Sequence, residues 1–247
     1  MKAMIFAAGM GTRLRPLTNS TPKALIKIND RPLLEWIILR LKSFGYKQLI
    51  INVYHHAESI VNFLDSKKNF GLHIEISRED ILADTGGGLK KAAWFFEDVD
   101  HFLIHNVDIL TDIDLNEMLS QHVQRNADAT LAIRKRQTSR YLLFNSELMM
   151  CGWRSKIDNQ TIWSTEEVAN AQEYAFSGIH IFSTDLLKKL KNDVVFSIIP
   201  EYLRLAANHS ICGYFTESDN WIDLGRKENL ESVNLLFDKA YFDKLSY

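Results

Sequence analysis

The sequence predicts an α/β fold in which a mainly parallel, mixed sheet is covered by helices on both faces. Through the first half of the chain, apolar runs of strand length alternate with amphipathic helical segments, an order typical of parallel strands joined by crossover helices. After residue 128 the pattern changes to short successive strands, which indicates a small antiparallel extension. A chain of 247 residues with 46% apolar side chains can bury a substantial core.

Each element of the first half follows from its own pattern. A helix is expected at 32–44, because Pro32 suits a first helical turn and Gly45 suits a helix end. The expected strands are at residues 2–8, 48–53, 73–77 and 101–107. Further helices are expected at about 56–65, 87–96 and 114–126.

The second half combines short strands with further helices. The strands are expected near 129–135, 141–144, 148–152, 175–182 and 211–216. The helices are expected around 184–191, around 197–208 and from about 226. Because no linker, repeat or low-complexity tract interrupts the chain, we expect one domain over 1–247, with one half at about 1–127 and another at about 128–247.

The composition argues against several kinds of partner. The net charge is −2 and no basic run alternates with aromatic residues, so nucleic acid is not an expected partner. Cys151 and Cys212 lack metal-ligand spacing and are expected to be free thiols in a reducing compartment. No apolar run reaches the roughly 18 residues of a membrane span, and no signal peptide precedes the first strand. We therefore expect a cytoplasmic protein without a membrane partner, and the oligomeric state stays open.

Residues 5–23 contain a motif suited to holding an anion. An apolar strand leads into a tight turn at Gly9 and Gly11, where backbone N–H groups can approach a ligand closely. Arg13 and Lys23 then bring two cations toward the same anion. The spacing predicts a grip for a nucleoside triphosphate.

Two familiar glycine motifs do not fit the same stretch. A dinucleotide-binding fingerprint needs a third glycine where this chain has Leu14, which counts against a redox enzyme of the Rossmann type. A P-loop needs Gly-Lys followed by Ser or Thr, and that sequence is missing here.

Two other positions suit ligand binding. Asp108 follows the strand expected at 101–107, and ligands of open parallel sheets bind beyond the carboxyl ends of strands. A carboxylate there can hold Mg²⁺, although a turn or helix-capping aspartate is the alternative. Residues 84–88, Asp-Thr-Gly-Gly-Gly, precede a helix and would expose N–H groups at its positive end, unless they form only a flexible loop.

Three segments resemble the sugar-1-phosphate nucleotidylyltransferases. Residues 5–23 match the family signature L-A-A-G-x-G-T-R-L-x-P-L-T-x-x-x-P-K at nearly every fixed position, with Phe6 in place of leucine. Residues 221–225 resemble the family motif W-x-D-V/I-G, with Leu224 as a mild variation. Residues 84–88 look most like the corresponding segment of the muramic acid 1-phosphate uridylyltransferases.

The resemblance implies a Rossmann-like fold, with a nucleotide-binding half at about 1–127 and a sugar-phosphate-binding half at about 128–247. It also implies a role for each matching residue. Arg13 and Lys23 would be the catalytic cations, Arg13 on the β- and γ-phosphates and Lys23 on the α-phosphate. Asp108 and Asp223 would bind a catalytic Mg²⁺. The implied nucleotide-binding residues are Ala8, Gly9, Gly11, Thr12, Arg13, Lys23, Thr85, Gly86, Gly87 and Asn106. The implied sugar-binding residues are Asp108 and Gly178, the latter in a strand that would pass under the acceptor sugar or, alternatively, form a core bulge.

Departures from the family pattern leave part of the site open. Val107 stands where the family usually has glycine, so its side chain would narrow the pocket or change the backbone angles near Asp108. The usual Glu-Lys pair before the strand at 175–182 is not found, so the residue that grips the acceptor phosphate stays unassigned. Candidates for it include Arg154, Lys156 and Glu173. We expect no C-terminal β-helix, because hexapeptide repeats are missing.

The function implied by the resemblance is Mg-dependent nucleotidyl transfer from a nucleoside triphosphate, UTP, to a sugar 1-phosphate, N-acetylmuramate 1-phosphate. A mannose- or heptose-1-phosphate guanylyltransferase is the first alternative. A non-catalytic, regulatory homologue that binds a nucleotide sugar is the second, and such proteins typically lose the cations or carboxylates that this chain retains. A role in cell-wall recycling would follow only if the acceptor were muramate.

Overall fold

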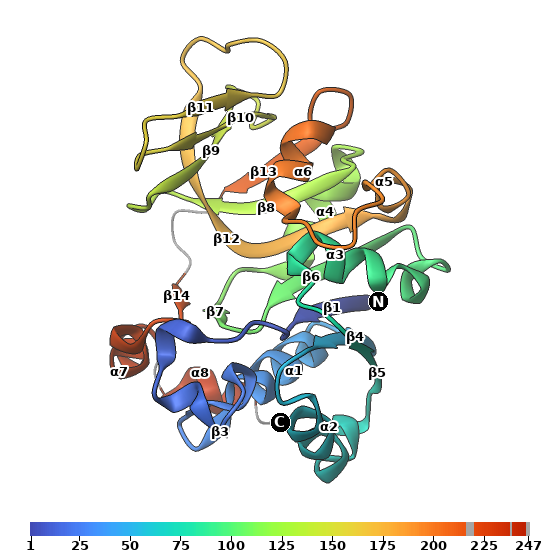
Figure 1. Ribbon diagram of the computed structural model, residues 1–247, viewed down its shortest axis with the longest axis vertical. Coiled ribbons are helices and arrows are strands. Elements are labelled where there is room, and N and C mark those ends of the chain that lie inside the picture. Colours follow the sequence, from blue (N-terminus) through green and yellow to red (C-terminus); the bar gives the residue numbers. More distant parts are fainter. Residues whose placement is uncertain (216–219, 238, 246–247) are drawn as a thin grey trace. The chain divides into compact units, whose positions relative to one another are not determined.

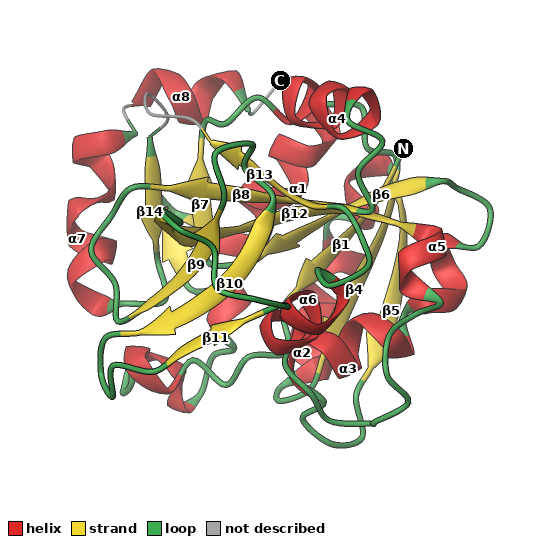
Figure 2. Ribbon diagram, turned by 90° about the horizontal axis from the view of Figure 1, so that it is seen from above, coloured by secondary structure: helices red, strands yellow, loops and turns green. Residues whose placement is uncertain are grey.

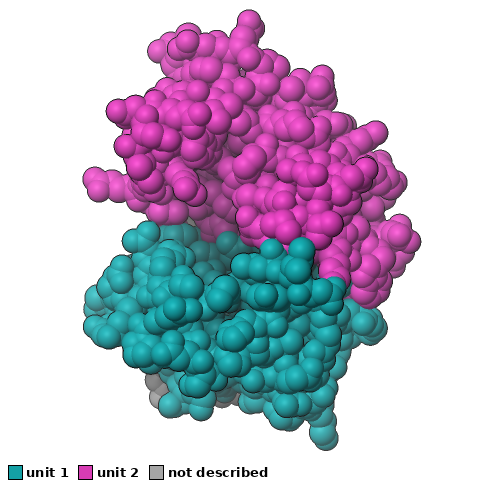
Figure 3. Space-filling view, viewed as in Figure 1, with its two compact units in different colours: residues 1–82, 104–113, 219–247 teal, residues 83–103, 114–218 magenta. Residues whose placement is uncertain are grey.

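The computed structural model describes residues 1–215, 220–237 and 239–245. Contacts divide the chain into two compact units, which Figure 3 shows in teal and magenta. The first unit comprises Met1–Leu82, Ile104–Ile113 and Asp219–Tyr247, and the second comprises Ala83–Leu103 and Asp114–Ser218. The boundaries of these units do not fall at residue 127. The assignment of a nucleotide half and a sugar half stays a prediction.

A parallel sheet lies at the centre of the first unit (Figure 1). β1 (Lys2–Phe6) pairs with β4 (Gln48–Val53), and β4 pairs with β5 (His73–Arg78), all in parallel. On its other side β1 neighbours β6 (His101–Asn106), whose second half belongs to this unit. β1 is buried along its whole length, which accounts for its continuous apolar sequence.

Helices and short strands complete the first unit. Its helices are α1 (Leu33–Ser43), α2 (Ala57–Ser66), α7 (Lys227–Leu236) and α8 (Lys239–Lys244). Its 3₁₀ turns are Thr12–Leu14, Leu17–Asn19, Lys23–Leu25 and Lys68–Gly71. Two antiparallel pairs join β2 (Lys27–Ile28) to β3 (Arg31–Pro32) and β7 (Ile109–Thr111) to β14 (Trp221–Asp223).

One apolar cluster connects distant parts of the first unit. It joins Leu14 of the loop after β1, Leu110 of β7, Leu224 of segment 221–225, and Phe237 and Phe242 near the C-terminus. Burial of each such side chain is worth about 1.5–3 kcal/mol. The glycine-rich loop and segment 221–225 are therefore held against the same core.

The second unit is mainly antiparallel (Figure 2). In its sheet β12 (Gln172–Ser183) pairs with β9 (Arg140–Phe144), β9 with β10 (Met150–Ser155), and β10 with β11 (Thr161–Trp163). β12 also pairs with β8 (Ala129–Arg134), and β8 pairs in parallel with β13 (Ile211–Phe215). The helices are α3 (Asp84–Lys91), a 3₁₀ turn at Ala93–Phe96, α4 (Leu115–Gln124), α5 (Thr184–Leu187) and α6 (Ile198–Leu205).

The predicted fold class is confirmed: the fold is mixed α/β, with mainly parallel central strands, helices around them and small antiparallel sheets. Some elements differ from the prediction. The helix expected at 184–191 ends at Leu187, because Lys189 and Leu190 form tighter i to i+3 hydrogen bonds. Segment 84–88 is helical, not a loop, because α3 begins at Asp84. Among the described helices, none is long and apolar enough to cross a membrane.

Candidate active site

The loop after β1 is fixed by the two glycines of the motif and by their neighbours. Gly11 has a left-handed φ of 61°, and a Cβ there would lie 2.8 Å from the side chain of Thr18. The Thr18 hydroxyl and the Leu14 N–H both donate to the Gly11 carbonyl, at 2.8 and 2.9 Å. A Cβ on Gly9 would lie 3.4 Å from Nζ of Lys23. The loop therefore wraps around the Lys23 side chain.

Lys23 forms a close ion pair with Asp108. Its Nζ lies 2.7 Å from Oδ2 of Asp108, and the two side chains are only 14% and 9% exposed. Burial acts to raise the pKa of Asp108, but the charge and hydrogen bond of Lys23 outweigh it, so the pKa is lower than usual. Asp108 is therefore ionised at neutral pH, and Lys23 balances its charge.

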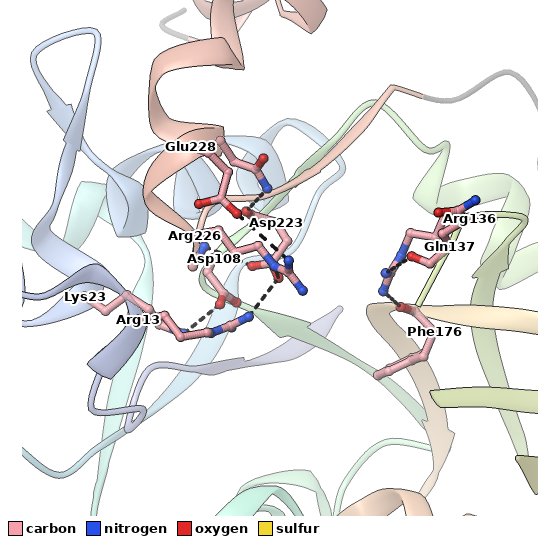
Figure 4. Close-up of polar contacts among 11 residues, drawn as sticks. Arg13, Lys23, Asp108, Arg136, Gln137, Phe176, Asp223, Arg226 and Glu228 are labelled. Atoms are coloured by element: carbon pink, nitrogen blue, oxygen red, sulfur yellow. Dashed lines mark hydrogen bonds and ion pairs between the residues drawn. The ribbon is translucent and has the colours of Figure 1, made fainter. Parts of the chain in front are cut away.

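Asp223 lies on the other side of this pair, in segment 221–225 (Figure 4). Its Oδ1 accepts a hydrogen bond from the Gly225 N–H at 2.9 Å, and its Oδ2 lies 3.5 Å from the Arg13 guanidinium and 3.8 Å from that of Arg226. The Leu224 N–H donates to the backbone carbonyl of Asp108 at 2.7 Å. These bonds hold the two aspartates in one place, although they are far apart in the sequence.

Gly225 lies close to the side chains of Asp108, Asp223 and Arg13. A Cβ on this residue would lie 2.6 Å from Oδ2 of Asp108, 2.9 Å from Oδ1 of Asp223 and 2.9 Å from a terminal nitrogen of Arg13. Any side chain here would enter the space between the carboxylates. The structure thus brings together four of the predicted residues, namely Arg13, Lys23, Asp108 and Asp223.

The donor set at this point fits Mg²⁺. Mg²⁺ is commonly held by one or two carboxylates together with substrate phosphates and water. Asp108 and Asp223 supply two carboxylates that both lie close to Gly225. Within residues 1–215, 220–237 and 239–245, no group of three or more His, Cys, Asp or Glu residues forms a self-sufficient metal site. The remaining ligands would therefore come from a bound phosphate and from water.

The other predicted residues of the first unit lie in or near this loop. Ala8 and Thr12 belong to the turn that contains Gly9 and Gly11, and Asn106 is the last residue of β6. The side chain of Val107 is buried, with 1% exposure, and its N–H donates to the Phe6 carbonyl. The expectation that Val107 narrows the pocket is therefore wrong, because its side chain packs in the core.

Sequence reasoning missed a buried polar pair at the ends of β4 and β5. Oδ1 of Asn52 accepts a hydrogen bond from the Ala7 N–H at 2.8 Å, and its amide donates to Oε1 of Glu79 at 2.7 Å. This pair fixes the exit of the chain from β1 into the glycine-rich loop. The signal in the sequence is an asparagine between apolar residues, in the run Leu-Ile-Ile-Asn-Val at 49–53.

The predicted residues of the second unit have different surroundings. The N–H groups of Gly86 and Gly87 both donate to the Phe196 carbonyl, at 2.9 and 3.2 Å. The Thr85 hydroxyl accepts a hydrogen bond from the Ile198 N–H at 3.0 Å. The expectation of exposed N–H groups in a loop is therefore wrong for Gly86 and Gly87, since both donors have protein acceptors. A contact of Thr85, Gly86 or Gly87 with the nucleotide stays a prediction.

Gly178 lies in an irregular part of β12. Its φ is 78°, and the register between β12 and β8 shifts between Phe176 and His180. This is the bulge that the sequence left open as an alternative. A contact between Gly178 and the acceptor sugar stays a prediction.

The unassigned cations of the second unit share one carboxylate. Arg154 and Lys156 lie 2.6 and 2.8 Å from the same Oε1 of Glu173. Burial acts to raise the pKa of Glu173, but the two cations outweigh it and lower the pKa. Both cations are thus partly neutralised by this carboxylate.

The match to a family model decides the family of the chain. The nucleotidyl transferase model matches residues 2–239. The chain belongs to the nucleotidyl transferase family. A UDP-glucose pyrophosphorylase structure from Acinetobacter baumanii shares the fold, with a TM-score of 0.76 and 17% identity over 99% of this chain and 97% of that one.

Relatives in this family act on different substrates. The chain is 29% identical to a UTP–glucose-1-phosphate uridylyltransferase of Synechocystis, over 92% of this chain and 60% of the relative. It is 28% identical to a mannose-1-phosphate guanyltransferase of Gibberella zeae, over 96% of this chain and 64% of the relative. It is 27% identical to an N-acetylmuramate α-1-phosphate uridylyltransferase of Neisseria meningitidis, over 96% of this chain and 98% of the relative. The chain thus spans about three-fifths of the first two relatives and nearly all of the third.

Proposed function

We propose that this chain transfers a nucleotidyl group from a nucleoside triphosphate to a sugar 1-phosphate. The observation that carries the proposal is the meeting of Arg13, Lys23, Asp108 and Asp223 around Gly225. Membership of the nucleotidyl transferase family supports it. The regulatory alternative is weaker, because neither the cations nor the carboxylates are lost.

The reaction needs positioning and charge balance more than a protein nucleophile. An ionised phosphate oxygen of the acceptor attacks the α-phosphorus of the triphosphate. The new P–O bond forms as the bond to the β-phosphate oxygen breaks, and pyrophosphate leaves with the electron pair. Under this proposal Lys23 balances charge at the α-phosphoryl group, and Arg13 binds the β- and γ-phosphates of the leaving group.

The carboxylates are assigned to the metal. Asp108 and Asp223 would hold Mg²⁺, which when bound neutralises charge on the phosphate oxygens. Because Lys23 already lies on Asp108 and Arg13 lies near Asp223, each cation has a carboxylate partner when no phosphate is bound.

UTP and N-acetylmuramate 1-phosphate are the proposed substrates. The support is the resemblance of segment 84–88 and the Neisseria meningitidis relative, which matches nearly end to end. Under this proposal the protein is cytoplasmic and acts in cell-wall recycling. A mannose- or heptose-1-phosphate guanylyltransferase is the second candidate, favoured by the Gibberella zeae relative at nearly equal identity.

The test is pyrophosphate release with Mg²⁺, with UTP, GTP, CTP, dTTP and ATP each combined with a panel of sugar 1-phosphates. We expect turnover with UTP and N-acetylmuramate 1-phosphate. Arg13→Ala and Asp108→Asn should each lower kcat by about 10²–10³-fold, the usual cost of losing one preorganised charge. Omission of Mg²⁺ should abolish turnover.

The matched control is Lys188→Gln, which removes one positive charge from an exposed pair with Asp185. Its kcat should equal that of the wild type. Melting curves check that each variant is folded. Near-normal turnover in Arg13→Ala or Asp108→Asn would remove that residue from the mechanism, and turnover with GTP and mannose 1-phosphate would establish the second candidate.

A further inference from the structure

The second unit contains a cavity that the catalytic residues do not use. Its volume is about 450 Å³, within the roughly 300–1,000 Å³ of small-molecule sites. The lining combines aromatic and aliphatic side chains with a few polar ones: Asp84, Arg140, Leu142, Trp153, Gln160, Ile162, Phe176, Ser197, Ile199, Pro200 and Leu203. Such a mixture suits a ligand with an apolar face and a few polar substituents.

Strand register places the floor of this cavity on one face of the sheet. Leu142 of β9 is opposite Trp153 of β10, and Trp153 is opposite Ile162 of β11. Arg140 lies two residues before Leu142, so it projects from the same face. Phe176 lies two residues after Tyr174, the partner of Leu142, and lines the same cavity. Aromatic rings here offer flat apolar surfaces, against which the C–H face of a sugar ring can pack.

Most of the remaining lining comes from α6, from Ser197 before it and from the start of α3. Ile199, Pro200 and Leu203 belong to α6. Asp84 begins α3, and its Oδ1 accepts hydrogen bonds from the N–H and hydroxyl of Thr85, at 2.6 and 3.2 Å. Its other carboxylate oxygen can accept hydrogen bonds from hydroxyl groups of a ligand.

Among the described residues that line the cavity, Arg140 is the only cation. Its backbone N–H donates to Thr138, whereas its guanidinium has no ion-pair partner within 4.0 Å in the described part of the chain. Asp158 experiences the positive charge of Arg140 but forms no ion pair with it. Arg154 differs from Arg140 in its direction and in its pairing. It projects from the opposite face of the sheet, and it forms an ion pair with Glu173. The guanidinium of Arg140 is therefore available to a ligand.

We propose that this cavity holds the sugar ring of the acceptor against Trp153 and Phe176, and that Arg140 selects an acceptor whose sugar carries a carboxylate. The proposal rests on the proposed function and defines its substrate class. Guanidinium and carboxylate form paired, charge-assisted hydrogen bonds, which are stronger than neutral ones. The lactyl carboxylate of N-acetylmuramate 1-phosphate supplies this group, whereas N-acetylglucosamine 1-phosphate has a hydroxyl at that position.

The test compares three acceptors with UTP and Mg²⁺: N-acetylmuramate 1-phosphate, its lactyl carboxamide, and N-acetylglucosamine 1-phosphate. In the wild type, kcat/KM for the carboxylate should exceed that for the carboxamide by about 10–100-fold, the range of a charged hydrogen bond. Arg140→Gln should bring this ratio close to one by reducing kcat/KM for the carboxylate alone. Arg140→Lys should keep part of the preference, and Lys188→Gln should keep all of it.

Different results would overturn different claims. If Arg140→Gln lowers kcat/KM equally for all three acceptors, or leaves the ratio unchanged while melting normally, the role of Arg140 in selection is wrong. A wild type that turns over all three acceptors equally also overturns the selection, while nucleotidyl transfer stands. A wild type that releases no pyrophosphate with any nucleotide and acceptor pair overturns the proposed function itself, before any variant is compared.

Discussion

Two glycine-rich regions of this chain look similar in sequence and differ in what faces their missing side chains. Around the loop after β1, Gly9 faces the ammonium group of Lys23, and Gly225 faces Asp108 and Arg13. In α3, a Cβ on Gly86 would lie 2.2 Å from the Phe196 ring, and one on Gly87 would lie 2.1 Å from the Val194 carbonyl. In the first region the close atoms are the charged ends of flexible side chains, and in the second they are an aromatic ring and a backbone carbonyl.

The difference shows what a glycine run signifies. Glycine allows another group to come close to the backbone, but that group can be a ligand or another part of the chain. In α3 the group is segment 194–196, which takes up both the space and the N–H donors. Near Gly225 the close groups are charged side chains suited to phosphate and metal. The regions should therefore respond differently to an added methyl group.

The largest effect is expected from Gly225→Ala. The new Cβ would displace the carboxylate of Asp108 and the guanidinium of Arg13, and misplaced catalytic groups lower kcat/KM by about 10²-fold or more. Because the displaced atoms are the ends of flexible side chains, the free energy of unfolding should fall by only about 1 kcal/mol. Pyrophosphate release and urea unfolding measure the two effects. Activity within threefold of wild type would show that activity does not require the absence of a side chain at residue 225.

Gly86→Ala should show the opposite pattern, with a loss of stability. Overpacking against Phe196 should lower the free energy of unfolding by about 1–3 kcal/mol. In a Phe196→Ala background the added methyl group has room, so the same change should be neutral or stabilise by up to about 1 kcal/mol, the helix preference of alanine. Urea unfolding of the wild type, the two single variants and the double variant gives the coupling free energy between residues 86 and 196. An equal cost in both backgrounds would mean that Phe196 is not what closes this region.

A third prediction concerns the pH dependence of the free energy of unfolding, to which His122 of the second unit contributes. Burial lowers the pKa of His122 to about 4, and the neighbouring His101 lowers it while Asp128 raises it. Between about pH 6.5 and pH 4 the unfolded chain binds the proton and the folded chain does not, so stability falls as the pH falls. His122→Gln should remove up to about 3 kcal/mol of this loss at pH 4, and little of it near pH 6.

The comparison is made by urea unfolding at pH 7, 6, 5 and 4. Part of the pH dependence should remain in His122→Gln, because burial and Arg40 lower the pKa of His105 in the first unit to about 3. An unchanged pH dependence in the variant would exclude His122 as a contributor. At pH 7 both histidines are neutral, so the glycine variants are best compared there.

The sequence predicted the long elements well because their patterns are local. The buried runs of β1 and β4 and the Pro32–Gly45 limits of α1 needed no knowledge of partners. Strands β7 and β14 were not predicted, since three residues carry no period and their pairing joins residues 109–111 to 221–223. Segment 84–88 was expected to be a loop, because glycine has a low helix preference. In the structure the segment is helical, and packing against Phe196 overrides that preference.

The candidate site was predicted residue by residue, but not its internal contacts. Arg13, Lys23, Asp108 and Asp223 came from motif resemblance, and the structure brings them together. The ion pair between Lys23 and Asp108 joins positions 85 residues apart, and no local pattern encodes it. The Asn52–Glu79 pair was missed for the same reason, because each residue alone has no distinctive spacing.

The apolar cluster of the first unit has a consequence for synthesis of the chain. Leu14, which directly follows Arg13 in the chain, packs in one core with Leu224, Phe237 and Phe242. During translation the N-terminal loop leaves the ribosome first, at about 5–20 residues per second, and waits for these late residues. The loop proposed to bind the triphosphate should therefore stay unformed on a nascent chain until Phe242 has emerged, so incomplete polypeptides should not bind nucleotide.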